Sequence, residues 1–189
     1  DGLVGRLRDH QGGMSRADDR TMVLIRSHPA MLDVESILEK SKACLKDGEK
    51  EVAHMLGQEA YRILPTHHGV LVHLTDLYFR EKKYLEAEPY LASYLAVSGD
   101  DNPEISKRMG EIYFHNGKIS SAKQELKKAV AGNPQDRESL LYLVDCYLKE
   151  HTPKKAVAVL KQAIKNFPMD TQVETLMNRV IAKTLMLSK

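Results

Sequence analysis

The chain has 189 residues, of which 42% are hydrophobic and 29% charged, with 28 basic and 26 acidic side chains and a net charge of +2. This near balance, with only three Phe and no Trp, argues against a nucleic-acid-binding protein, which needs a basic surface and aromatic side chains on which bases stack. A chain of this length folds without a metal or disulfide staple. No apolar run approaches the roughly 18 residues of a membrane span, and no signal peptide is visible.

The segment 1–33 is rich in Gly, Arg and Asp and lacks sustained periodicity, which predicts a linker or N-terminal extension. The apolar run Met22–Ile25, which stops before Pro29, is expected to form a short strand or an extra helical turn. One hypothesis is that this run folds back into a binding groove and blocks it. Because the chain begins at Asp1 rather than Met, we expect it to be a piece of a longer protein.

Prolines close similar segments at nearly equal spacing in the rest of the chain. Pro134 and Pro168 are one interval apart, and Pro65 and Pro134 are about two such intervals apart. The stop expected between Pro65 and Pro134 falls near Gly99, in a turn-rich segment that ends at Pro103. A unit that recurs about every 34 residues predicts a solenoid of stacked helix pairs.

Each unit is predicted to hold two short helices joined by a tight turn. Gly48 precedes Pro65 by the same distance as Gly117 precedes Pro134, and both glycines supply the left-handed conformation that such a turn needs. Helices this short are stable only when they are stacked. We therefore predict an all-α domain over 34–189, with units at 34–67, 68–102, 103–136 and 137–170 and a capping helix at 171–187.

Small residues recur where paired helices would touch, and larger ones recur in the gaps between them. The positions are Ala53, Ala87, Ala122 and Ala156 in the second helices and Cys44, Tyr78, Tyr113 and Tyr147 in the last turns of the first helices. In this pattern, residues 34–168 resemble the tetratricopeptide repeat family. Gly57 and Lys40 depart from it in unit one, as does Tyr94 in unit two. The resemblance implies a right-handed α-solenoid of about four helix–turn–helix units plus a C-terminal capping helix.

The resemblance also implies a concave groove, lined by the first helix of each pair, that takes an extended peptide or a partner helix. In units two to four we expect the partner to contact Val72, His73, Asp76, Phe79, Lys107, Arg108, Glu111, Phe114, Leu141, Tyr142 and Asp145. Apolar side chains among charges of both signs suit a short motif held by a few anchors. A chaperone C-terminus is not expected, because only Arg108 fits the carboxylate clamp of chaperone-binding members and Glu104 would repel the ligand.

Other site chemistry has little support in the sequence. Cys44 and Cys146 sit on apolar helical stripes, which favours buried thiols in a reducing compartment over a disulfide. His67, His68 and His73 lack the helical spacing and the acidic partners of a metal site. No nucleotide loop, nucleophile elbow or zinc-protease helix is present. We therefore expect no catalytic residues, no cofactor and no metal.

The leading functional hypothesis is a protein–protein interaction scaffold that binds a protein or peptide partner in the cytoplasm, with no nucleic acid and no membrane span in this piece. The alternative is a regulatory or oligomerising appendage of an upstream signalling domain such as a bacterial receiver, or of a secretion or catalytic domain. The start at Asp1 and the degenerate first unit motivate this alternative. This alternative includes self-association into a homo-oligomer.

Overall fold

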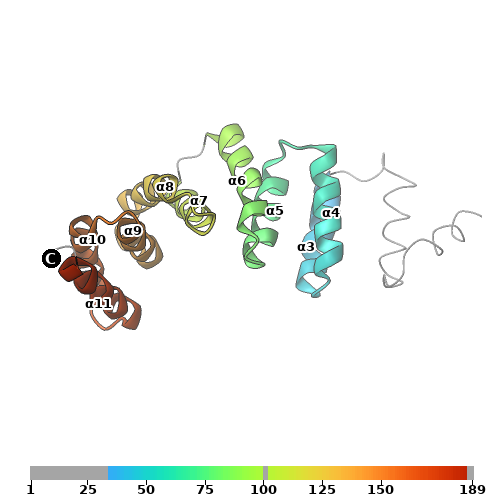
Figure 1. Cartoon of the computed structure of the whole chain (residues 1–189). Coiled ribbons are helices and arrows are strands. Elements are labelled where there is room, and N and C mark those ends of the chain that lie inside the picture. Colours follow the sequence, from blue (N-terminus) through green and yellow to red (C-terminus); the bar gives the residue numbers. More distant parts are fainter. Residues whose placement is uncertain (1–33, 100–101, 187–189) are drawn as a thin grey trace, which may run out of the picture. The chain divides into compact units, whose positions relative to one another are not determined.

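A computed structural model describes residues 34–99 and 102–186, and within these ranges every regular element is an α-helix (Figure 1). The predicted all-α fold is therefore confirmed. The predicted linker 1–33, with its apolar run, and the last residue of the predicted capping helix, Leu187, lie outside the described residues. The chain divides into two compact units, Asp1–His73 and Leu74–Lys189, and each is described by itself.

The described part of the N-terminal unit is a pair of packed helices, α3 (Val34–Lys46) and α4 (Lys50–Ile63), followed by the start of α5 (His68–Arg80). Each helix places apolar side chains three or four positions apart, so one face becomes buried. Ile37 and Leu38 on α3 and Leu56 on α4 are each 1% exposed. Gly48 joins the pair with a φ of 85°, which confirms the left-handed turn predicted there.

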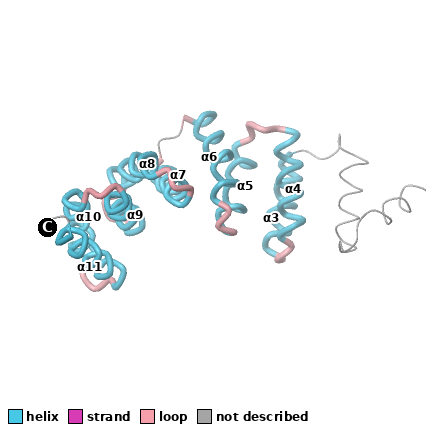
Figure 2. Tube along the Cα trace, in the orientation of Figure 1, coloured by secondary structure: helices cyan, strands magenta, loops and turns pink. Residues whose placement is uncertain are grey.

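The C-terminal unit contains the end of α5 and six further helices: α6 (Tyr84–Ser98), α7 (Pro103–His115), α8 (Ile119–Gly132), α9 (Arg137–Lys149), α10 (Pro153–Asn166) and α11 (Thr171–Met186). Short loops connect successive helices from α7 to α11 (Figure 2). The pairs α7–α8 and α9–α10 pack internally, and α8 packs on α9. The first helices also contact one another, α7 with α9 and α9 with α11, so they form one layer.

Small residues allow the two helices of a pair to approach closely. Ala87, Ala122 and Ala156 are fully buried, at 0% exposure. Gly110 on α7 faces Leu126 on α8, and a Cβ added at Gly110 would lie 2.6 Å from Cγ of Leu126. Interiors are close-packed and contacts of this kind leave no room for an extra carbon. These positions therefore fix the separation between paired helices.

The helix boundaries have repeating local causes. Asn102 and Asp136 cap the starts of α7 and α9 by accepting backbone N–H bonds, and Asp170 does the same for the first residues of α11. These three caps are equally spaced along the chain, with the same interval as that between Pro134 and Pro168. The predicted stop near Gly99 is confirmed, because Gly99 ends α6 with a φ of 61°.

Two of the tight turns do not use glycine. Gly117 links α7 to α8 with a φ of 76°, but Lys82 and His151 adopt φ values of 59° and 56° at the corresponding places after α5 and α9. A residue with a Cβ is disfavoured in this left-handed region. The turn geometry is thus imposed by the packing of the two helices. Among the described residues, no helix combines the length and the apolar character needed to cross a bilayer.

Candidate functional site

The first helices of the C-terminal unit carry nine of the eleven predicted groove residues. Phe79 and Asp76 lie on the end of α5, and the other seven lie on α7 and α9: Lys107, Arg108, Glu111, Phe114, Leu141, Tyr142 and Asp145. The remaining two, Val72 and His73, lie in the N-terminal unit. There, His73 is only 6% exposed, and its Nε2 is 2.7 Å from Oγ of Ser41, so its ring packs inside that unit.

The two predicted basic residues form ion pairs with carboxylates of neighbouring first helices. Arg108 on α7 contacts the carboxylate of Asp76 on α5, and its guanidinium carbon lies 5.4 Å from the ring centre of Phe79. Lys107 lies 3.0 Å from Asp136 and 2.8 Å from Glu138, at the start of α9. These ion pairs are partly exposed, and each of them joins adjacent first helices.

Asp145 and Arg179 form the corresponding pair between α9 and α11. Oδ1 of Asp145 is 2.6 Å from Nη1 of Arg179, an ionic contact made by an oxygen atom shielded from solvent. Arg179 occupies the place equivalent to that of Asp145 one repeat later in the sequence. The sequence pattern predicted only a capping role for α11, and Arg179 was not among the predicted groove residues. The offset of one full repeat between Asp145 and Arg179 is the sequence signal that could have identified Arg179 as part of this face.

Aromatic side chains gather beside these ion pairs. Tyr142 on α9 donates a 3.0 Å hydrogen bond to Oε1 of Glu111, and its hydroxyl lies 3.2 Å from Nε2 of His115. Because the single hydroxyl hydrogen is used on Glu111, His115 donates to Tyr142. Tyr84 stacks on His115 with 4.1 Å between ring centres, and Phe114 meets Tyr142 at 5.1 Å. Tyr84 and His115 were not among the predicted site residues.

Burial shifts the pKa of the titratable side chains in and beside this aromatic cluster (Tyr84, Phe114, His115 and Tyr142). It raises the pKa of Glu111 above its usual value, against the hydrogen bond from Tyr142, which lowers it. Burial also raises the pKa of Tyr142, and the neighbouring Glu111 adds to that shift. The pKa of His115 is lowered by burial and by the positive charge of Lys149. The lowered pKa favours the neutral form of His115, which can donate to Tyr142 through Nε2.

A hollow of about 460 Å³ lies between α9 and α11, next to the aromatic cluster. Its lining combines apolar and charged side chains of α9 and α11: Arg137, Glu138, Leu141, Tyr142, Asp145, Gln172, Thr175, Leu176 and Arg179. Leu141 and Leu176 are 8% and 5% exposed, so they form a mostly buried floor beneath the polar rim. We call this the α9–α11 hollow. Its volume lies within the range of binding pockets in proteins.

His67 and the two cysteines take structural places in the described residues. His67 accepts the backbone N–H of Val70 through Nδ1, at 3.3 Å, and its Nε2 is 2.8 Å from Glu35. It thus acts as a cap at the start of α5. No group of three metal-ligating side chains occurs in residues 34–99 and 102–186. The thiols of Cys44 and Cys146 are free, and burial raises the pKa of Cys146 to about 12.

The family model for the tetratricopeptide repeat matches residues 78–138 and 113–180, which together cover more than half of the chain. The chain belongs to the tetratricopeptide repeat family. The resemblance inferred from the spacing of small and large residues is therefore confirmed, and the fold is an all-α tetratricopeptide solenoid. Proteins of this family are commonly interaction scaffolds and are generally non-catalytic. The matched segments begin at Tyr78 and leave the divergent first unit outside.

The similar proteins are also built from these repeats. A TPR repeat-containing protein, YpiA of Bacillus subtilis (strain 168), is 25% identical over 146 residues, which are 77% of this chain and 34% of YpiA. The chain thus spans about a third of the length of this curated relative.

Solved structures share the fold at lower identity. A crystal structure of MamA gives a TM-score of 0.73 at 15% identity and covers 80% of this chain and 82% of its own. MamA 41-end from Desulfovibrio magneticus RS-1 gives 0.65 at 14%, with coverage of 90% and 94%. Cut9, in the APC/C hetero-tetramer Cut9–Hcn1, gives 0.63 at 14%, with coverage of 86% and 33%. At these identities the likeness concerns the fold alone.

Proposed function

We propose that this chain is a protein-interaction module that holds a partner peptide or domain against the first helices of its C-terminal unit. The observation that carries the proposal is the α9–α11 hollow, which combines a leucine floor with a charged rim. An apolar side chain of a partner would lose contact with water on this floor, while polar groups of its backbone meet Tyr142, Gln172 and Thr175. Such anchors typically supply most of the affinity of a peptide.

The ion pairs on this surface favour binding over catalysis. Arg108, Lys107 and Arg179 each neutralise a carboxylate on an adjacent helix, so they preorganise the surface rather than activate a nucleophile. A rigid surface loses less conformational entropy when a partner binds. We propose that the function is recognition, with no reaction at this face.

The two free thiols support a location in a reducing compartment such as the cytoplasm. Cys146 is fully buried and Cys44 is partly buried, and they lie in different compact units. Proteins of oxidising compartments usually pair their cysteines. We therefore propose that the partner is encountered in the cytoplasm.

A blocked hollow tests the proposal. Thr175 is exposed at the rim, and Thr175→Trp would fill the hollow without removing a rim charge. Gln124 is exposed on the second helix α8, so Gln124→Trp is the matched control. Proteins captured by the wild-type chain should be retained by the control and lost by Thr175→Trp, as measured by quantitative mass spectrometry of affinity-purified samples. Equal capture by both variants, each with an unchanged circular dichroism spectrum, would overturn the proposal.

A further inference from the structure

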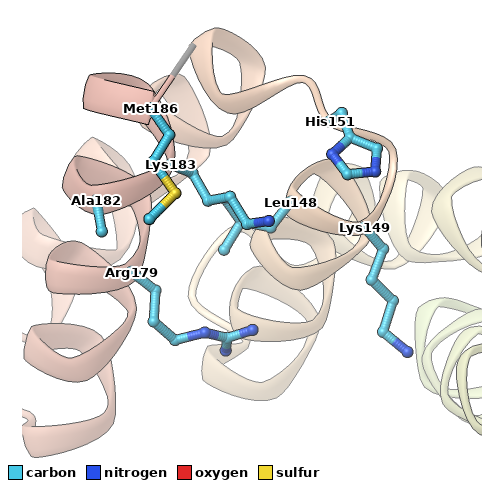
Figure 3. Close-up of a pocket in the computed structure, with 7 residues that line it drawn as sticks. All are labelled: Leu148, Lys149, His151, Arg179, Ala182, Lys183 and Met186. Atoms are coloured by element: carbon cyan, nitrogen blue, oxygen red, sulfur yellow. The ribbon is translucent and has the colours of Figure 1, made fainter.

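A second hollow, of about 370 Å³, lies between the end of α9 and the second half of α11. Its polar lining is entirely basic: Lys149, His151, Arg179 and Lys183. Its apolar lining is Leu148, Ala182 and Met186. In Figure 3, the side chains of Arg179 and Lys183 extend from α11 toward the α9 side of the hollow. We call this the basic hollow.

The positive charge of the basic hollow is only partly balanced. Among the described residues no Asp or Glu lines the basic hollow, and of its basic side chains Arg179 alone has an acidic partner on α9. Asp145 pairs with Arg179, and Glu150 lies 2.5 Å from Lys123 on α8. Among the described residues, no ion pair is made by His151 or Lys183. The ammonium group of Lys149 lies 4.2 Å from the ring centre of Phe114, a contact that leaves its charge uncompensated.

The basic side chains of the hollow are not needed to satisfy the last carbonyl groups of α9. The last carbonyl groups of a helix lack partners within it, and basic side chains often bond to them. Here the last carbonyl groups already accept backbone N–H groups of the following turn. Glu150 donates to Cys146 at 3.0 Å, His151 to Leu148 at 3.2 Å, and Thr152 to Tyr147 at 2.9 Å. The cluster therefore retains its hydrogen-bond donors for a ligand.

We propose that the basic hollow binds an acidic peptide segment of the partner, with Asp or Glu carboxylates at Lys183 and His151 and an adjacent apolar side chain against Leu148 and Met186. The inference rests on the proposed function and names the chemistry of the partner. Charge complementarity supports it, because carboxylates would pair with the basic side chains that make no ion pair within residues 34–99 and 102–186. The apolar wall would hold the neighbouring side chain.

Two features favour a peptide carboxylate as the ligand. Arg179 lines both the α9–α11 hollow and the basic hollow, so the two adjoin and an extended peptide can pass from one to the other. Arginine is the residue best suited to bidentate recognition of phosphate, and the one guanidinium here is already paired with Asp145. The remaining donors are the ammonium group of Lys183 and the imidazole ring of His151, and both can donate to a carboxylate.

A peptide titration of the whole chain tests this inference. The probe is a capped peptide with Asp and Glu residues around one Leu and one Phe, and its control replaces every Asp and Glu by Asn and Gln. In ¹H–¹⁵N NMR spectra, the acidic peptide should shift the amides of Leu148, Lys149 and Lys183, and the amide peptide should bind at least tenfold more weakly. The double variant His151→Gln/Lys183→Gln, which removes both proposed carboxylate contacts, should weaken binding about tenfold.

The matched control is Lys154→Gln/Lys161→Gln, which removes two exposed charges from α10 and should change the affinity less than twofold. Equal binding by both double variants, equal binding of both peptides, or no shift at millimolar peptide would overturn the inference. Binding only of a version in which phosphoserine replaces the acidic residues would overturn the carboxylate assignment. If the acidic peptide shifts only the amide signals of Thr175 and Leu176, the basic hollow is excluded as its binding site, while the proposed function stands.

Discussion

The hydroxyl oxygen of Ser41 on α3 lies 2.7 Å from Nε2 of His73 on α5, and both side chains are buried. Ser41 donates its only hydrogen to the carbonyl of Ala53, 2.6 Å away, so His73 must donate to Ser41. Ser41→Ala would leave the N–H group of His73 without this acceptor. We predict that the free energy of unfolding falls by about 1–3 kcal/mol, measured by urea denaturation at pH 7.

The control for this prediction is Ser93→Ala, at a partly exposed position on α6. Its effect should stay within about 0.5 kcal/mol, as is usual for surface substitutions. An effect of Ser41→Ala no larger than that of Ser93→Ala would show that the link between α3 and α5 does not contribute to stability.

Any side chain at position 110 is expected to lower the stability of the protein. A Cβ at this position would lie 2.6 Å from Cγ of Leu126 and 3.2 Å from its backbone nitrogen, so α7 and α8 would have to separate. We predict that Gly110→Ala lowers the free energy of unfolding by about 1–3 kcal/mol. Leu126→Ala should make room for the added methyl group. In a double-mutant cycle, the combined variant should therefore lose less stability than the two single losses together. Simple additivity would contradict the close approach.

Lys82 is predicted to be a site where glycine stabilises the protein. Its φ of 59° places a side-chain-bearing residue in the left-handed region, which disfavours it by about 1–2 kcal/mol. Glycine removes that penalty, but it increases the conformational entropy of the unfolded chain, which lowers stability by about 0.5–1 kcal/mol. Lys82→Gly should thus raise the free energy of unfolding by up to about 1 kcal/mol. Lys127→Gly, within the exposed face of α8, should lower it. A loss of stability in both variants would refute the strain argument.

Asp170 is predicted to make the free energy of unfolding decrease at acidic pH. The hydrogen bonds from Arg137, at 2.6 and 2.9 Å, and from the backbone of Val173 lower its pKa to about 2. An unfolded Asp titrates near 3.9, so the stabilisation is fully present above about pH 4 and is lost as the pH falls toward 2. Asp170→Asn should remove part of this pH dependence, measured by denaturation at several values between pH 6 and 2. An unchanged slope would contradict the assignment, and Glu174→Gln on the exposed face of α11 is the control.

The fold was largely predictable because its rules are local and periodic. Ala87, Ala122 and Ala156 had to be small wherever two helices meet, and Gly117 had to turn left-handed, so their spacing alone revealed the architecture. Lys82 and His151 show the limit of that logic. Tertiary packing forces them into the same conformation although their residue types disfavour it.

The candidate site was less predictable because its chemistry arises between helices. Sequence periodicity placed Tyr142 and Asp145 on a first helix, but it contained no information on which partner each would meet. Glu111 precedes Tyr142 by almost one repeat and Arg179 follows Asp145 by one repeat, and these separations become contacts only through the stacking of successive helices. The basic hollow depends on the C-terminal half of α11, whose role as a continuation of the first-helix layer became clear from its contact with α9.

Photo-crosslinking from the rim of the α9–α11 hollow tests the central claim most directly. A photoreactive amino acid would replace Gln172, which lines this hollow, and in a parallel sample it would replace Gln124 on the second helix α8. If the first-helix face holds the partner, irradiation in cells should produce a discrete covalent adduct from position 172 and none of the same mass from position 124. Identical adduct patterns from the two positions, or adducts from position 124 alone, would contradict the account.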